Sequence, residues 1–232
     1  MLILLATLVI SSGSPAGQAQ DTSGPPAQPL PVDQELRFEH LTTEDGLSEG
    51  RVWGITQDSR GFMWFATWDG LNRYDGYEFK VYKQEPDEPN SPGGNSFWVI
   101  YEDRAGMIWA GSQTGGGLSR FDPTKEQWTR YQHDPGDPNS LGSSNVYAIL
   151  EDSDGVLWIG TEGGGLNRFD GETEEEQARF TRFGYDPNDP HSLSSAFVSS
   201  IYEDRSGVLW IGTYGGGLHR FDRETESFTR YQ

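Results

Sequence analysis

Two stretches of this chain, GVLWIGTEGGGLNRFD at 155–170 and GVLWIGTYGGGLHRFD at 207–222, are nearly identical. Internal repetition constrains the fold strongly, because each copy of a repeat folds as one unit that packs on its neighbours. Aligning the chain on the tryptophan of these stretches identifies four copies, at spacings of 45, 49 and 52 residues. Such a period is typical of β-propeller blades. The equivalent tryptophans are Trp64, Trp109, Trp158 and Trp210.

Each copy predicts four short strands in the same order. The first is an apolar run rich in aromatic and β-branched residues, such as VYAILED at 146–152, and such residues favour strands. A tight turn with glycine follows, then a strand containing the tryptophan, a glycine-rich turn, and two further strands. The predicted fold is all-β, with four four-stranded antiparallel blades at about 47–82, 92–131, 141–183 and 193–231.

Residues that repeat in every copy are interpreted as structural. The four tryptophans are expected to form the repeated core between blades, since repeated packing explains a repeated residue. An arginine precedes an aspartate by two positions on each third strand, which places both on one strand face and predicts structural ion pairs. These pairs are Arg73–Asp75, Arg120–Asp122, Arg168–Asp170 and Arg220–Asp222.

Glycine-rich and acidic segments offer no cofactor or metal chemistry. A nucleotide-binding glycine loop needs a following helix, whereas a strand follows each glycine run here. The segment DSDG at 152–155 begins like a calcium loop but lacks the later glutamate, so it is interpreted as a hairpin turn. We therefore expect no cofactor, no metal and no catalytic residue.

The net charge and the N-terminus bear on location and partners. The formal charge of −19 opposes nucleic-acid binding, and the absence of cysteine excludes disulfides and thiolate ligands. The apolar run 2–10 followed by small residues predicts a signal peptide over 1–19, although no basic residue precedes it. A short anchor helix is the alternative. The Pro-rich segment 20–35 is expected to be a disordered linker. We expect an exported protein, periplasmic or extracellular.

The repeat, with its Asp-x-x-Gly turn, its tryptophan strand and its Leu-x-Arg-Phe-Asp strand, resembles the two-component regulator propeller repeat. Linkers such as DEPNSP (87–92), DPNSL (137–141) and DPHSL (189–193) add to the resemblance, which covers about 36–232. The first copy departs from it, with Ala66 in place of glycine and a shortened turn. The resemblance implies seven-bladed propellers in the periplasmic sensory part of bacterial hybrid histidine kinases, many of which respond to polysaccharide fragments.

One further segment, at 36–41, resembles a fourth strand without a blade of its own. Fourth-type strands thus outnumber the sets of the other three. Propellers close by sharing a strand between the first and last blades, and this count leaves no vacancy for the extra one. We therefore expect a piece of a longer sensor, with further propeller blades and signalling domains in the full-length protein or on a partner chain.

Residues that vary between otherwise equivalent positions are the candidates for ligand binding, since packing alone would repeat them. They lie at the start of the first strands or in the turns between second and third strands, and carry aromatic rings, an amide and a carboxylate. They are Trp53, Trp68, Trp98, Gln113, Tyr147, Glu162 and Tyr214. The expected ligand is a carbohydrate or another small extracellular molecule. The alternative is that Trp53 and Trp98 only pack at the propeller centre.

Three classes of function remain. The favoured one is a non-enzymatic extracytoplasmic sensor or ligand-binding propeller of a two-component signalling protein. The alternatives are a protein-interaction propeller and a propeller lyase, which would use histidine and acids around the channel. The histidines at 40, 133, 191 and 219 show no convergent placement, and His219 is predicted to lie on the surface of a third strand.

Overall fold

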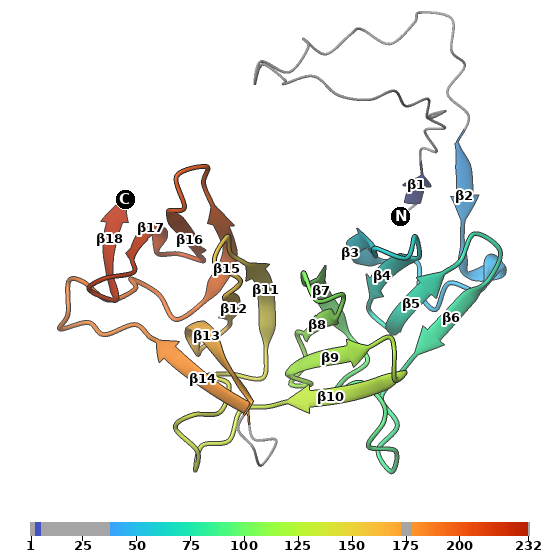
Figure 1. Cartoon of the computed structure of the whole chain (residues 1–232), viewed down its shortest axis with the longest axis horizontal. Helices are drawn as coiled ribbons and strands as arrows, with labels where there is room; N and C mark the ends of the chain where they lie inside the picture. The colour runs from blue at the N-terminus through green and yellow to red at the C-terminus, as the bar shows by residue number, and fades with distance from the viewer. Residues whose placement is uncertain (1–2, 6–37, 173–177, 232) are drawn as a thin grey trace, which may run out of the picture.

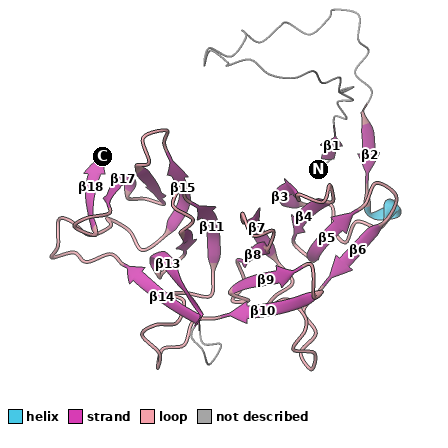
Figure 2. Cartoon of the chain, viewed as in Figure 1, coloured by secondary structure: helices cyan, strands magenta, loops and turns pink. Residues whose placement is uncertain are grey.

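The computed structural model describes residues 3–5, 38–172 and 178–231. In these residues the regular structure is β-strand, apart from one short 3-10 helix, η1 (Thr43–Asp45) (Figure 2). Four antiparallel sheets of four strands each follow one another along the chain, with the strands of each sheet in sequence order. The predicted fold class, all-β with four-stranded blades, is confirmed.

We number the sheets blades 1 to 4. Blade 1 contains β3 (Val52–Gln57), β4 (Met63–Thr67), β5 (Gly70–Tyr74) and β6 (Phe79–Tyr82). Blade 2 contains β7 (Phe97–Glu102), β8 (Ile108–Ser112), β9 (Leu118–Asp122) and β10 (Gln127–Tyr131). Blade 3 contains β11 (Val146–Glu151), β12 (Leu157–Thr161), β13 (Gly165–Glu172) and β14 (Ala178–Phe183). Blade 4 contains β15 (Val198–Glu203), β16 (Leu209–Thr213), β17 (Gly217–Asp222) and β18 (Ser227–Tyr231).

The blades stand around an open arc, with the first strand of each blade on the inside and the fourth on the outside (Figure 1). Neighbouring inner strands contact one another, β3 with β7, β7 with β11, and β11 with β15. The loops that join one blade to the next contact the turns between second and third strands, through backbone hydrogen bonds such as that from Gly165 to Ala196, so both gather where the first strands begin.

Apolar layers fill the spaces between consecutive blades. Trp64 packs with Phe97 and Ile100 of the next blade, and Trp109 packs with residues of blade 3 such as Val146. Trp158 is in the third layer, with Val198 and Phe228 among others. The facing surfaces of consecutive blades are thus buried against each other, which supplies the apolar burial that a single blade lacks.

An aspartate at the end of each first strand organises the following turn. Asp152 is buried, and its carboxylate accepts hydrogen bonds from the indole N–H of Trp158 at 2.7 Å and the backbone N–H of Val156 at 2.9 Å. The turn closes at a glycine with positive φ, Gly155 at 82°. The indole–carboxylate bond recurs in every blade, between Trp64 and Asp58, Trp109 and Asp103, and Trp210 and Asp204.

The predicted arginine–aspartate pairs are mostly wrong. Within the described residues only Arg168 forms one, with Asp170 at 2.7 Å. Arg120 instead meets Glu172 at 3.0 Å. Asp122 accepts from the backbone N–H and the hydroxyl of Thr124, and these bonds lower its pKa to about 2. The aspartate of this motif therefore caps the turn that leads into the fourth strand.

The extra strand lies outside the blades. β2 (Glu39–Leu41) pairs with β1 (Ile3–Leu5), a short strand within the predicted signal peptide. The rest of that predicted peptide and the predicted linker lie outside the described residues. In the described part of the chain, no helix is long and apolar enough to cross a membrane.

Candidate functional site

A β-bulge opens the inner strand of each blade. In blade 1, Val52 pairs with Thr67 and Gly54 with Ala66, so Trp53 is an extra residue in the ladder. A bulge bends the strand and changes the direction of the side chain it carries. The same register shift falls at Trp98, Tyr147 and Ser199 in the other blades. Three of the four bulges thus present an aromatic ring at the inner end of a blade.

These rings join others from the neighbouring loops into one continuous line, which we call the aromatic row. Its centre is the stacked pair Trp53 and Trp98, with ring centroids 4.3 Å apart. Trp68 lies 6.3 Å from Trp53 on one side, and Tyr147 lies 5.3 Å from Trp98 on the other. Beyond Tyr147 the row continues through Phe197 at 4.7 Å and then Tyr214, 5.4 Å further.

The aromatic row is accessible, unlike the aromatic layers between blades. Trp53 is 41% exposed and Tyr214 is 73% exposed, and Trp68 is also exposed. Trp98, Tyr147 and Phe197 are partly buried. An exposed line of aromatic rings costs hydration free energy in the unbound protein, and such surfaces mark binding sites.

Amides and one carboxylate flank the middle of the row. Glu162 accepts long hydrogen bonds from the hydroxyl of Tyr147 at 3.3 Å and the amide of Asn145 at 3.4 Å. Burial raises the pKa of Tyr147, and the negative charge of Glu162 acts in the same direction. Gln113 donates to the hydroxyl of Ser96 at 3.2 Å. At one end of the row, the guanidinium of Arg51 lies 6.0 Å from the ring centroid of Trp68.

Backbone hydrogen bonds between blades hold this surface together. The N–H of Gly117 donates to the carbonyl of Ser144 at 2.9 Å, and that of Gly165 to Ala196 at 2.9 Å. The side chain of Asn145 adds a bond from Gly115 at 2.8 Å. The turns of one blade are thus tied to the loop that starts the next blade, and these bonds position the rings relative to one another.

The structure brings most of the predicted ligand-binding residues together. Trp53, Trp68, Trp98, Tyr147 and Tyr214 are in the aromatic row, and Glu162 adjoins it. Gln113 lies in the equivalent turn of blade 2. Phe197 was not among the predicted site residues. Its signal was an aromatic side chain at the position that holds Arg51, Ser96 or Asn145 in the other copies. A ligand-binding role for these residues remains a prediction.

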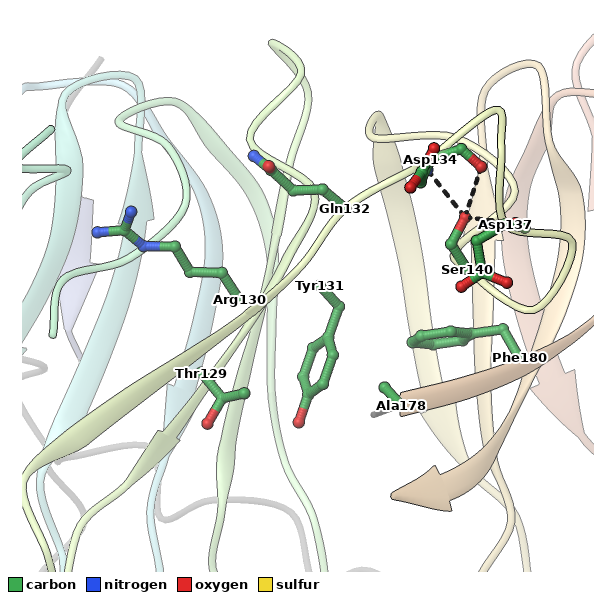
Figure 3. A pocket seen from close by; sticks show the side chains of 9 residues that line it. All are labelled: Thr129, Arg130, Tyr131, Gln132, Asp134, Asp137, Ser140, Ala178 and Phe180. Carbon is green, nitrogen blue, oxygen red and sulfur yellow. Dashed lines mark hydrogen bonds between the residues drawn. The ribbon is translucent and has the colours of Figure 1, made fainter. Parts of the chain in front are cut away.

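A hollow lies away from the row, between the outer strands of blades 2 and 3 and the linker that joins these blades (Figure 3). It has a volume of about 500 Å³, and its walls include Tyr131, Phe180 and the linker residues Asp134, Asp137 and Ser140. A similar hollow of about 400 Å³ lies between blades 3 and 4. Ser140 bonds within its own linker, and no residue of the aromatic row lines either hollow. We interpret both as gaps between repeated strands and linkers.

In the described residues, no group of three or more histidine, aspartate or glutamate side chains is placed to hold a metal ion. The predicted surface location of His219 is wrong, because its side chain is fully buried on β17. The linker that contains Ser194 covers this part of β17. The alternation of residues along a strand does not reveal such a covering segment. Asn72, Ser119 and Asn167 at the equivalent positions are buried in the same way.

Comparison with known proteins identifies the repeats. A family model described as two-component regulator propeller matches residues 46–69, 140–163 and 192–215. Over 54 residues the chain is 44% identical to a histidine kinase of Formosa agariphila, a match covering 23% of this chain and 4% of that protein.

Solved structures show the same relationship. The extracellular domain of a hybrid two-component system of B. thetaiotaomicron matches with a TM-score of 0.72 and 30% identity, covering 84% of this chain and 26% of that chain. Virginiamycin B lyase of Staphylococcus aureus has a TM-score of 0.59 at 16% identity over 84% of this chain and 59% of that chain, a likeness of fold alone. The chain thus spans a minor part of its sensor relatives. The resemblance to the two-component regulator propeller repeat, expected from the sequence, is thus confirmed at these three matched segments.

Proposed function

We propose that this chain is the ligand-recognising part of an exported sensor propeller, and that it binds its ligand without converting it. The observation that carries the proposal is the aromatic row, which crosses all four blades along their inner ends. A ligand lying along the row contacts every blade at once, so its binding can change how neighbouring blades sit against each other.

The ligand class that fits is a linear, uncharged oligosaccharide. Sugar rings have apolar faces that stack on aromatic side chains and hydroxyl rims that need polar partners. Asn145 and Glu162 provide such partners beside Tyr147. The carboxylate of Glu162 accepts hydrogen bonds from hydroxyls and repels a uronate or a sulfate, and the net charge of −19 acts in the same direction.

Within the signalling protein, the proposed partners of this chain are a further set of blades and an output domain. On the outward face of blade 4, Leu218 is 42% exposed, whereas Leu166 at the equivalent position of blade 3 is fully buried. Tyr231 is also exposed there. This apolar face fits another blade of the same kind. Export is supported by the extracellular location of the domains that this chain resembles.

Calorimetric titration with neutral linear oligosaccharides of increasing length, and with uronate oligomers of matched length, tests the proposal. We expect at least one neutral series to bind, with affinity rising with length, and chromatography to recover the sugar unchanged. Glu162→Gln should reduce the difference in affinity between neutral oligosaccharides and uronate oligomers. Conversion of the oligosaccharide to products would show that the protein is a lyase. Absence of binding to every oligosaccharide would contradict the proposal and favour a protein-interaction propeller.

A further inference from the structure

The third strand of each blade carries a buried side chain that holds the linker entering that blade. Asn72 accepts the backbone N–H of Ser48 at 2.9 Å, and Asn167 accepts that of Gly142 at 2.8 Å. In blade 2 the acceptor is the hydroxyl of Ser119, which takes the N–H of Gly93 at 2.9 Å. We call this bond the linker latch. Its amide and hydroxyl acceptors do not titrate over the physiological pH range.

Blade 4 builds the same latch from a group that does titrate. His219 is fully buried, and its Nε2 accepts the backbone N–H of Ser194 at 3.0 Å. The hydroxyl of Ser194 also lies 2.8 Å from Nε2. On the other side of the ring, Nδ1 faces the carbonyl of Ile211 at 3.3 Å and therefore carries the proton. The latch requires the neutral ring, because an imidazolium has no lone pair to offer Ser194.

The surroundings of His219 disfavour its charged form. Burial lowers the pKa of His219, the bond to the Ile211 carbonyl opposes this, and the positive charge of Arg230 lowers the pKa again. Arg230 is the cross-strand neighbour on β18. β16 contributes the carbonyl of Ile211, and the linker contributes Ser194. In the described residues, no carboxylate lies within ion-pair distance of His219.

The latch is connected to the blade 4 end of the aromatic row. The hydroxyl of Ser194 donates to the carbonyl of Gly216 at 2.5 Å, in the turn that carries Tyr214. The backbone N–H of Tyr214 donates to the carbonyl of Phe197 at 2.9 Å, at the end of the same linker. Losing the bond from the Ser194 N–H to His219 therefore removes one support of the linker that is hydrogen-bonded to this turn.

We propose that His219 is an acid-sensitive latch, which fixes Phe197 and Tyr214 in the aromatic row at neutral pH and releases them when the ring is protonated. Its effect on ligand binding rests on the function proposed above, whereas the latch itself does not. The other three blades keep their latches at acid pH, so acidification loosens one end of the row only.

Hydrogen exchange of this chain at about pH 7.5 and about pH 5, corrected for the intrinsic exchange rate at each pH, tests the latch. We expect protection of the linker 192–198 to fall at least roughly tenfold on acidification, while the equivalent linker 140–146, latched by Asn167, stays protected. His219→Asn installs the acceptor of blades 1 and 3 and should abolish the acid response. Equal behaviour of the two linkers, or an acid response that persists in His219→Asn, would overturn the proposal.

The same two pH values separate this proposal from the proposed function. If a neutral oligosaccharide binds, its affinity should fall several-fold at about pH 5 in the wild type and not in His219→Asn. An unchanged affinity together with acid-dependent exchange would overturn the link to the aromatic row. If no oligosaccharide binds at either pH, the proposed function fails, and the exchange experiment still decides whether the latch exists.

Discussion

The layers between the blades and the aromatic row are both rich in large aromatic side chains, and they differ in almost everything else. The layers use residues that recur in every copy, such as Trp64 and Trp158, which are buried and hydrogen-bonded to an aspartate. The row uses bulge and loop positions whose residues change from copy to copy, and several of its rings are exposed. Residues that repeat in every copy pack between the blades, whereas the residues at the bulges vary and form the exposed aromatic row.

Removing a ring from a layer should produce the largest effect. Trp158→Ala deletes a buried indole and leaves the carboxylate of Asp152 without one of its donors. We expect a loss of about 3–5 kcal/mol in the free energy of unfolding, measured by denaturant titration. The matched variant Trp210→Ala should lose clearly less, because Trp210 lies on the outward face of blade 4. Equal losses would mean that this face is covered in solution.

The equivalent residues Leu166 and Leu218 compare a covered face of a blade with an uncovered one. Leu166→Ala should cost about 2–5 kcal/mol, as for other buried leucines. Leu218→Ala should cost less than about 1 kcal/mol, since this side chain is already 42% exposed. Denaturant unfolding of both variants checks the difference. A high cost at Leu218 would contradict the exposure seen here and point to association through blade 4.

Acid stability should depend on the aspartate of the layer. Burial raises the pKa of Asp152, but the hydrogen bonds from Trp158, Val156 and Arg223 outweigh burial and hold this pKa below the ordinary value of an aspartate. The unfolded chain then binds the proton more readily, so this stabilisation is complete above the ordinary pKa and is lost as pH falls through the native one. Asp152→Asn should flatten the fall in unfolding free energy between about pH 5 and about pH 3. If the unfolding free energy of Asp152→Asn falls with pH as steeply as that of the wild type, Asp152 does not contribute to acid stability.

The strand order and the blades follow from the repeat period, from turn glycines such as Gly155 and from the alternating apolar runs. The bulges do not, since a one-residue register shift at Trp53 or Trp98 leaves no mark in a period-2 pattern. The sequence signal of the row is the variation between equivalent positions of the four copies. The burial of His219 was not predicted, because a linker covers its strand. Three of the four predicted arginine–aspartate pairs do not form, because the aspartates bond to their own turns. Distances along one strand face do not reveal such competing donors.

Removing a ring from the row should have the smallest effect on stability. Trp53→Ala deletes a bulge side chain that is 41% exposed, so we expect a loss in unfolding free energy of less than about 1 kcal/mol. Tyr77→Ala is the matched control, because Tyr77 is 93% exposed at a turn of blade 1 and is not part of the row. Denaturant unfolding of both variants checks that the fold is retained.

Calorimetric titration of these two variants with a neutral oligosaccharide that binds the wild type is the most direct test of the aromatic row. The account predicts at least about a tenfold loss of affinity for Trp53→Ala, equivalent to about 1.4 kcal/mol, and wild-type affinity for Tyr77→Ala. Wild-type affinity in a folded Trp53→Ala protein would contradict it, and would show that the ligand binds away from the row.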